Sequence, residues 1–322
     1  MTEQNQELYA PQQGFVAPRA EDEFLHTGGD PSDYTISETS YLGFNIPESG
    51  INGEIYHWYH PNLGIASGGL LLFQGHKQQT AEADYLDYRN FQPLPQSDLH
   101  EHSYPTGVRI RVVQPLQEIE VRFRSPDGAT SLDLTSTAIM PAAGRADGKH
   151  FAQAMRSTGE LVLDGEKHTI DSFFTRDRSY LSPRPEGPHA IPPLTWGAAV
   201  FNQELAIHFV AHDSLSLSDE QLRWGYVWRH GELRRPVRIR QQTFRAEDGV
   251  TPHAADVEIE DEAGELYRLR GRSIARMPMS FWPNMVTNLM LMRYESEDGS
   301  VSFGEYQDVV FNSFLRSARR QQ

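Results

Sequence analysis

The sequence contains no cysteine in its 322 residues. Without thiols there are no disulfides, no thiolate nucleophile, no cysteine-ligated zinc and no iron–sulfur cluster. Long hydrophobic runs are also missing, and no stretch approaches the roughly eighteen apolar residues that a membrane-spanning helix needs. The start of the chain lacks the basic and apolar regions of a secretory signal. We therefore expect a soluble, cytoplasmic protein.

Positive charge is scarce, since 29 Lys and Arg stand against 44 Asp and Glu, for a net charge of −15. A field of that sign repels nucleic-acid phosphates and anionic lipids, so we expect no nucleic-acid partner and no membrane insertion. The G-x-S-x-G, P-loop, H-E-x-x-H and G-x-G-x-x-G motifs are absent as well. The absence of these motifs therefore disfavours hydrolase, kinase and nicotinamide-enzyme functions, and we expect no cofactor.

Helical periodicity is nearly absent, and the dominant hydrophobic period is two. Apolar and polar residues alternate as in half-buried antiparallel strands, and Gly-containing pairs such as Asp164-Gly165 and His230-Gly231 supply tight turns between them. The pattern predicts an all-β protein with less than about a fifth of its residues in helices. One short helix is expected within 308–320. The clearest alternating segments are 108–113, 118–123, 131–135, 160–164, 204–209 and 267–272.

Two halves are expected. Residues 1–23 are polar and predict a flexible arm. The Pro/Gly/Ala-rich patch at 141–148 predicts a boundary between a domain at 24–147 and a second at 148–322. Similar meanders on either side suggest a diverged duplication. Because closing a meander removes its exposed edges, we expect two antiparallel barrels or sandwiches in tandem.

The thirteen histidines offer little for a metal ion. His208 and His212 share a strand face but stand about 13 Å apart, too far to chelate one ion. His100 and His102 form an H-x-H pair in a polar, proline-flanked segment. We expect no tightly bound transition metal, and His100 and His102 are the residues that bound metal would implicate.

Two segments carry candidate site residues. His57, Trp58 and Tyr59 alternate imidazole and aromatic side chains, which suits a pocket wall or simply a half-exposed strand end. The second segment places Arg176, Arg178 and Arg184 close to a single carboxylate, Asp177. Guanidinium groups around a carboxylate lower its pKa and pair with it bidentately. The cluster is therefore either a buried structural clasp or part of a site.

The chain from Gly148 resembles a known family. The segment 148–155 (Gly-Lys-His-Phe-Ala-Gln-Ala-Met), the hairpin at Asp164-Gly165 and the Asp177-Arg-Ser element resemble the H-x-F-x-Q-x-M strand, the D-G-E hairpin and the D-R-S-W-G signature of bacterial proteins similar to the carotenoid 1,2-hydratase and tocopherol cyclase group. Segments 41–45, 53–59 and 298–306 resemble the opening and closing strands of that family. In this chain Tyr180-Leu181 replaces the Trp-Gly of the signature.

The resemblance implies two lipocalin-like barrels in tandem. It also implies hydration, dehydration, isomerisation or cyclisation of a hydrophobic isoprenoid- or steroid-like molecule by alkene protonation, without a cofactor. Asp177 is the implied catalytic residue, with Tyr180 beside it, although nearby arginines would favour a base or an ion-pair partner over an acid. The alternatives are a non-catalytic carrier of such a ligand and a purely structural double barrel. A second copy of the chain, in a homodimer, remains open as a partner. The residues expected to bind substrate are His57, Trp58, Tyr59, Arg178, Arg184, Trp196 and Glu305.

Overall fold

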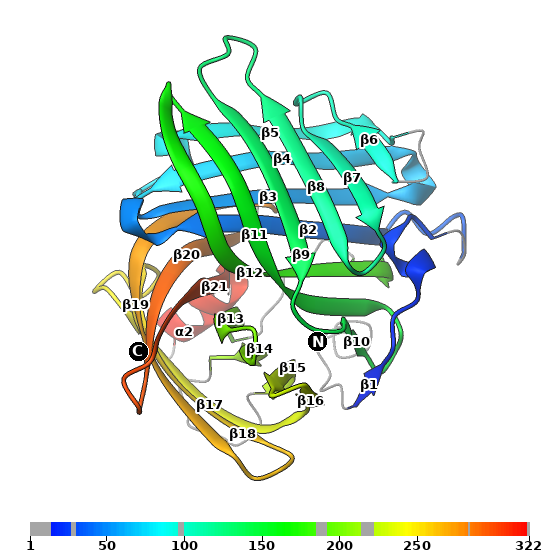
Figure 1. Ribbon diagram of the computed structural model, residues 1–322. Helices are drawn as coiled ribbons and strands as arrows, with labels where there is room; N and C mark the ends of the chain where they lie inside the picture. The colour runs from blue at the N-terminus through cyan, green and yellow to red at the C-terminus, as the bar shows by residue number, and fades with distance from the viewer. Residues whose placement is uncertain are drawn as a thin grey trace. The chain divides into compact units, whose positions relative to one another are not determined.

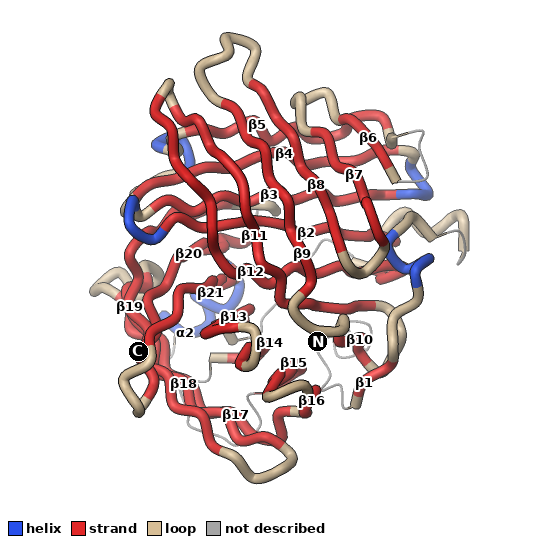
Figure 2. Tube along the Cα trace, viewed as in Figure 1, coloured by secondary structure: helices blue, strands red, loops and turns tan. Residues whose placement is uncertain are grey.

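Strands dominate the computed structural model, which describes residues 14–26, 30–95, 100–184, 192–213, 222–282 and 284–320. Strands make up 67% of the model and helices 6%, so the expected all-β class is confirmed (Figures 1 and 2). No helix among these residues is long and apolar enough to cross a membrane. The chain divides into an N-terminal unit, Phe15–Gln74 with Ala83–Pro185, and a C-terminal unit from Glu186 onward that also takes Gly75–Glu82.

The N-terminal unit is one antiparallel sheet that curls on itself. Its strands follow the order β5-β4-β3-β2-β12-β11-β9-β8-β7-β6, with β10 paired to β11 and β1 paired to β10. The strands are β1 Phe15–Val16, β2 Ile36–Ile46, β3 Ile51–His60, β4 Ile65–Gln74, β5 Tyr85–Pro93, β6 Glu101–Ser103, β7 Arg109–Gln114, β8 Glu118–Arg124, β9 Ser131–Ala138, β10 Ala143–Arg145, β11 His150–Leu163 and β12 Glu166–Pro183.

The C-terminal unit is a second antiparallel sheet, in the order β16-β15-β14-β13-β21-β20-β19-β18-β17. The expected helix is shorter than predicted, because Asp308–Phe311 still belong to the last strand. The elements are β13 Leu194–Asn202, β14 Leu205–His212, β15 Leu222–Arg229, β16 Glu232–Arg234, β17 Pro236–Arg245, β18 Pro252–Asp261, β19 Leu266–Met279, β20 Met285–Ser296, β21 Val301–Phe311 and the helix α2 Asn312–Arg319.

The two sheets have the same topology. From β5 to β7 and from β16 to β17 the strands correspond one to one, with β12 and β21 in equivalent places beside β2 and β13. This agreement supports the diverged duplication that the two meanders suggested. Both sheets are curled and antiparallel, consistent with the two tandem barrel-like domains that we expected.

The domain boundary differs from the one expected at residues 147 and 148. The segment 141–148 is no linker: it contains β10, which pairs with β1 and β11. Beyond it, β11 pairs with β9, and β12 pairs with β2, so both strands complete the first sheet. Backbone pairing to distant strands outweighs local Pro/Gly composition here. The compact units separate instead near residue 185.

A short segment between β4 and β5 belongs to the C-terminal unit. The Lys77 amide donates to the Arg276 carbonyl at 2.7 Å, and the Arg276 amide donates to the Gly75 carbonyl at 2.9 Å. The Thr80 hydroxyl adds a bond of 2.7 Å to the Pro278 carbonyl. These bonds attach the segment to β19, which is why residues 75–82 group with strands that follow much later in the chain.

Turn chemistry and alternation account for the strand pattern. Asp164-Gly165 and His230-Gly231 have positive φ at both positions, as a two-residue hairpin turn with the favoured twist requires. Each of the six alternating segments lies in a strand apart from an end residue, and most of their apolar residues are buried in the core of their unit, with Val113 an exposed exception. One core includes Leu42, Phe44 and Ile55 of the N-terminal unit, and the other includes Ile207, Phe209 and Tyr294 of the C-terminal unit.

Candidate functional site

Strand β3 is buried on both of its faces. Ile51, Ile55 and Tyr59 point into the core of the N-terminal unit. Successive side chains of a strand point to opposite sides, so Asn52, Glu54, Tyr56 and Trp58 lie on the other face. That face is not a solvated one, because Asn52 is 0% exposed, Glu54 1% and Trp58 8%. A buried face that carries an acid among aromatic rings is costly to maintain and is a candidate site.

The neighbouring strands add further tyrosines to this face. Tyr41 of β2 lies directly opposite Tyr56. On the other side Tyr56 pairs with Gly69 of β4, which in turn pairs with Tyr88 of β5. A side chain at Gly69 would meet the Asp87 carbonyl at 1.7 Å, so only glycine fits between the two tyrosines. We call the set Tyr41, Asn52, Glu54, Tyr56, Trp58 and Tyr88 the Glu54 face.

Glu54 is held as a neutral acid. The Asn52 side-chain amide donates to Oε1 of Glu54 at 3.1 Å, and the Tyr41 hydroxyl also hydrogen-bonds the carboxyl. Oε2 is buried and has no hydrogen-bond partner among the described residues. Burial raises the pKa of Glu54 to about 8, and the bonds from Tyr41 and Asn52 only partly offset this. At neutral pH the carboxyl therefore carries a proton that it can donate.

The rings of the Glu54 face meet edge to face. The centroids of Tyr41 and Tyr56 are 5.3 Å apart, and those of Tyr56 and Trp58 are 5.5 Å apart. Burial raises the pKa of Tyr56 well above 10, so its hydroxyl stays protonated. The guanidinium of Arg184 lies 4.8 Å from the centre of the Trp58 ring. Such ring faces carry negative potential and favour positive charge over them.

Asp177 lies beside this face rather than between the neighbouring arginines. In the register of β12 with β2 it pairs with Tyr41, and its charge contributes to raising the pKa of Tyr56. Arg176 and Arg178 point to the opposite side of β12, as alternation requires. The expected cluster of three guanidinium groups around Asp177 is therefore wrong for Arg176 and Arg178.

Those two arginines bind the N-terminal segment instead. Arg176 makes a bidentate pair with Glu23, with N–O distances of 2.6 and 2.9 Å, and also donates to the Gln153 side chain. Arg178 pairs with Glu38 at 3.0 Å and donates to the carbonyls of Asp22 and Phe24. We call these contacts the arginine clasp.

The clasp changes the interpretation of the chain's beginning. Residues 1–23 were expected to form a flexible arm; residues 1–13 lie outside the described part. In the rest, Phe15–Val16 pair with β10, Ala20–Glu23 form a 3₁₀ turn, and Asp22 and Glu23 are buried. The described part of the arm is thus docked on the sheet, because buried arginines demand buried carboxylates.

The other expected site residues of the N-terminal unit lie away from the Glu54 face. His57 and Tyr59 point inward. There the ring of His57 stacks on that of Tyr104, with centroids 3.6 Å apart, and the hydroxyls of Tyr59 and Tyr104 are hydrogen-bonded. Burial holds the pKa of His57 well below 6.5. The ring of Tyr180 stacks on that of His26, with centroids 4.1 Å apart, next to the arginine clasp. Of the residues expected from sequence, the Glu54 face is joined by Trp58, Asp177 and Arg184.

The histidines considered for a metal are dispersed. His100 is exposed and packs beside Phe24, whereas His102 is buried next to Tyr104. Within the described ranges, no three or more His, Asp or Glu side chains are grouped so that they could hold a metal ion. Trp196 and Glu305 lie on β13 and β21 of the C-terminal unit, where both are buried.

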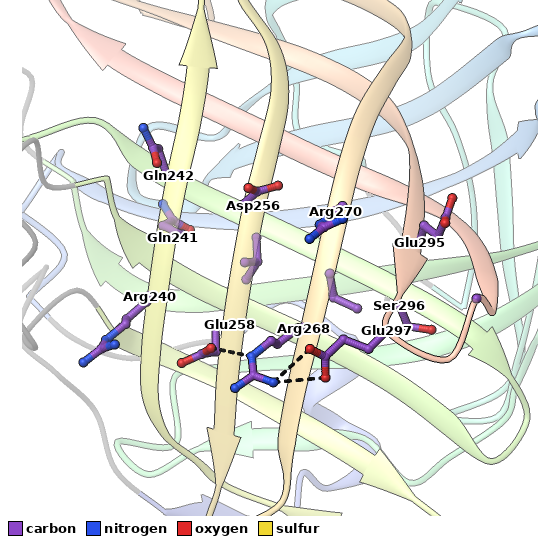
Figure 3. A pocket seen from close by; sticks show the side chains of 13 residues that line it. Arg240, Gln241, Gln242, Asp256, Glu258, Arg268, Arg270, Glu295, Ser296 and Glu297 are labelled. Carbon is purple, nitrogen blue, oxygen red and sulfur yellow. Dashed lines mark hydrogen bonds and ion pairs between the residues drawn. The ribbon is translucent and has the colours of Figure 1, made fainter.

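A surface hollow of about 560 Å³ lies over β17 to β20 of the C-terminal unit (Figure 3). Charged and amide side chains make up most of its lining, beside Val257 and Leu269, and Arg268 bonds Glu258 at 2.6 Å and Glu297 at 2.9 Å. The charged side chains of this open hollow suit a polar ligand better than an apolar one. We therefore place the candidate site on the Glu54 face and not in this hollow.

Sequence reasoning missed Glu54, Tyr41, Tyr56, Asn52 and Tyr88. A signal was present, because Glu54 is the one carboxylate of a strand rich in apolar and aromatic residues and is followed at two-residue intervals by Tyr56 and Trp58. A carboxylate at such a position is usually on a solvated face. Only the burial of both faces of β3 shows that Glu54 is a buried carboxyl rather than a solvated one.

Solved structures with the same fold span almost the whole chain. Kievitone hydratase from Nectria haematococca is similar with a TM-score of 0.55 and 12% identity, over 95% of this chain and 97% of that one. A protein from Nitrosomonas europaea provisionally named AttH is similar with a TM-score of 0.54 and 12% identity, over 94% and 99%. No curated protein matches the sequence. A family model described as a domain of unknown function, DUF7064, matches residues 19–307, and the chain therefore belongs to the DUF7064 family.

Proposed function

We propose that this protein is a cofactor-independent hydratase or dehydratase, or an isomerase or cyclase of the same chemistry, that acts on a hydrophobic isoprenoid- or steroid-like molecule. Glu54 is the proposed acid, in place of the Asp177 that the sequence suggested. The observation that carries the proposal is a buried carboxyl, neutral at pH 7, among the rings of Tyr41, Tyr56 and Trp58. The likeness of the fold to a hydratase supports the reaction class by analogy alone.

The reaction would begin with proton transfer from Glu54 to one carbon of an alkene. The π electrons of the double bond form the new C–H bond, and the other carbon becomes cationic. The faces of Tyr56 and Trp58 would stabilise that cation. Water then adds through its oxygen, and a carboxylate, Asp177 or the ionised Glu54, takes the released proton. Dehydration is the same path in reverse, and cyclisation replaces water with a second double bond of the substrate.

The carrier alternative makes a different demand on the site. A carrier of hydrophobic ligands is best served by a wholly apolar lining, because a buried carboxyl lowers the affinity for an apolar molecule. The buried Glu54 favours the enzyme, since its desolvation is useful for proton transfer. Binding without turnover remains the outcome that would favour the carrier.

Incubation with kievitone and with a panel of isoprenoid alkenes in ¹⁸O-labelled water tests the proposal. Hydration should give a product heavier by one labelled water, dehydration a product lighter by one water, and isomerisation or cyclisation an isomer of unchanged mass, all detected by chromatography with mass spectrometry. Glu54→Gln should lower the rate by about two to four orders of magnitude, the usual contribution of general acid catalysis. Glu48→Gln, which changes an exposed carboxylate near β3, is the matched control and should not affect it. Ligand binding without conversion to a hydrated, dehydrated or isomeric product, or full activity in Glu54→Gln, would contradict the assignment.

A further inference from the structure

The C-terminal unit carries its own buried titratable side chain on the face away from its core. Ile207, Phe209 and Ala211 of β14 enter the core of this unit. His208 lies between them in sequence and therefore points to the other face. Its side chain is nevertheless fully buried, at 0% exposed.

Aromatic rings surround His208. The ring centroid of Trp196 on β13 is 4.7 Å from that of the imidazole, and those of Trp224 and Tyr226 on β15 are each 5.4 Å away. Tyr226 is the direct cross-strand partner of His208. The imidazole is thus the polar centre of an aromatic wall built by three adjacent strands.

The hydrogen bonding of His208 fixes its tautomer. Nδ1 lies 2.9 Å from the carbonyl oxygen of Gly197. A carbonyl oxygen only accepts, so Nδ1 carries the proton and Nε2 keeps its lone pair. Burial lowers the pKa of His208 to about 3, which keeps the ring neutral at physiological pH. Nε2 is buried and accepts no hydrogen bond from any described residue.

We propose that the C-terminal unit holds a second small-molecule site, in which Nε2 of His208 accepts a hydrogen bond from the hydroxyl of a hydrophobic, ring-bearing ligand packed against Trp196, Trp224 and Tyr226. A buried acceptor without a donor is costly, and native proteins retain such groups where a ligand or water supplies the missing bond. A neutral acceptor selects a hydroxyl over a carboxylate or phosphate, which bring negative charge and no donor. The site does not depend on proton transfer by Glu54.

The ligand class is tested with a pair of probes, 1-naphthol and its methyl ether, which share their rings and differ in the hydroxyl. Isothermal titration calorimetry of the full-length protein should show at least about tenfold tighter binding of 1-naphthol. His208→Asn keeps a donor for the Gly197 carbonyl and removes the acceptor at Nε2, so the preference should disappear. The melting temperature of the variant reports whether it is folded. Equal affinity for both probes, or a preference that survives in folded His208→Asn, would overturn the proposal.

A second measurement follows ligand binding in the wild-type protein and uses the variant only to assign a resonance. In wild-type protein labelled with ¹⁵N-histidine, the resonance that is missing from the His208→Asn spectrum identifies His208. Addition of 1-naphthol should shift its Nε2 signal, and addition of the methyl ether should not. An unmoved Nε2 signal at saturating 1-naphthol would show that no hydroxyl reaches this nitrogen, and the proposal would fail whatever the activity at Glu54.

Discussion

Glu23→Gln is expected to lower the free energy of unfolding by about 3–5 kcal/mol, the usual cost of removing one partner of a buried ion pair. Arg176 is 3% exposed and would keep its charge without a carboxylate. Burial alone would raise the pKa of Glu23, but Arg176 and the Leu116 amide hold it below its usual value. The ion pair therefore stabilises the fold at pH values above the usual pKa of a glutamate, and this stabilisation is lost as the pH falls into the acid range.

Asp177→Asn is the matched control for this prediction. Asp177 follows Arg176 directly in the sequence, but it points to the other side of β12 and pairs in register with Tyr41. Its replacement leaves both clasp arginines paired, so we expect a clearly smaller loss of stability than for Glu23→Gln. Urea unfolding of the two variants, followed by tryptophan fluorescence, makes the comparison. Equal losses would mean that the clasp is not the dominant support of the N-terminal segment.

Glu54→Gln is expected to stabilise the protein, by an amount that grows with pH. In the unfolded chain Glu54 ionises near its ordinary pKa of 4.5, whereas burial raises the pKa to about 8 in the folded state. Between these values the folded state binds one proton more, so the stability due to Glu54 is full below 4.5 and is lost as the pH rises through 8. At about 1.4 kcal/mol for each unit of pKa difference, the loss reaches several kcal/mol.

Glutamine removes this pH dependence because it cannot ionise, while it retains an oxygen that accepts from Asn52. The stability difference between Glu54→Gln and wild type should therefore be small at pH 5, grow through pH 7 and level off above pH 8. Other titrating groups cancel in the difference. Denaturant unfolding at these pH values measures it, with Glu48→Gln as the control expected to stay flat. A constant difference from pH 5 to pH 9 would contradict a raised pKa at Glu54.

Together these variants distinguish residues that stabilise the fold from residues that act in the reaction. A clasp variant should lose stability, and activity only through that loss. Glu54→Gln should lose activity while gaining stability at high pH, which is the signature of a strained functional group rather than a structural one.

The sequence by itself determined the all-β class and the hairpins, and it suggested the duplication that the matching strand orders support. These features depend on neighbouring residues, because a two-residue period and a turn such as Asp164-Gly165 act over a few positions of the chain. Local aromatic and charge patterns also pointed to Trp58, Asp177 and Arg184, which the structure places on or beside the Glu54 face. Which residues share a strand face was readable in the same way.

Only the tertiary structure decided which faces are buried and which charges meet. Alternation in β3 separates Glu54 from Tyr59 but cannot reveal that both are hidden from water. Arg176 pairs with Glu23, 153 positions earlier in the chain, and no local pattern marks that partner. The pKa of a carboxyl depends on its desolvation and on the charges around it, and both are set by residues distant in sequence. For that reason the sequence pointed to Asp177, and the fold pointed to Glu54.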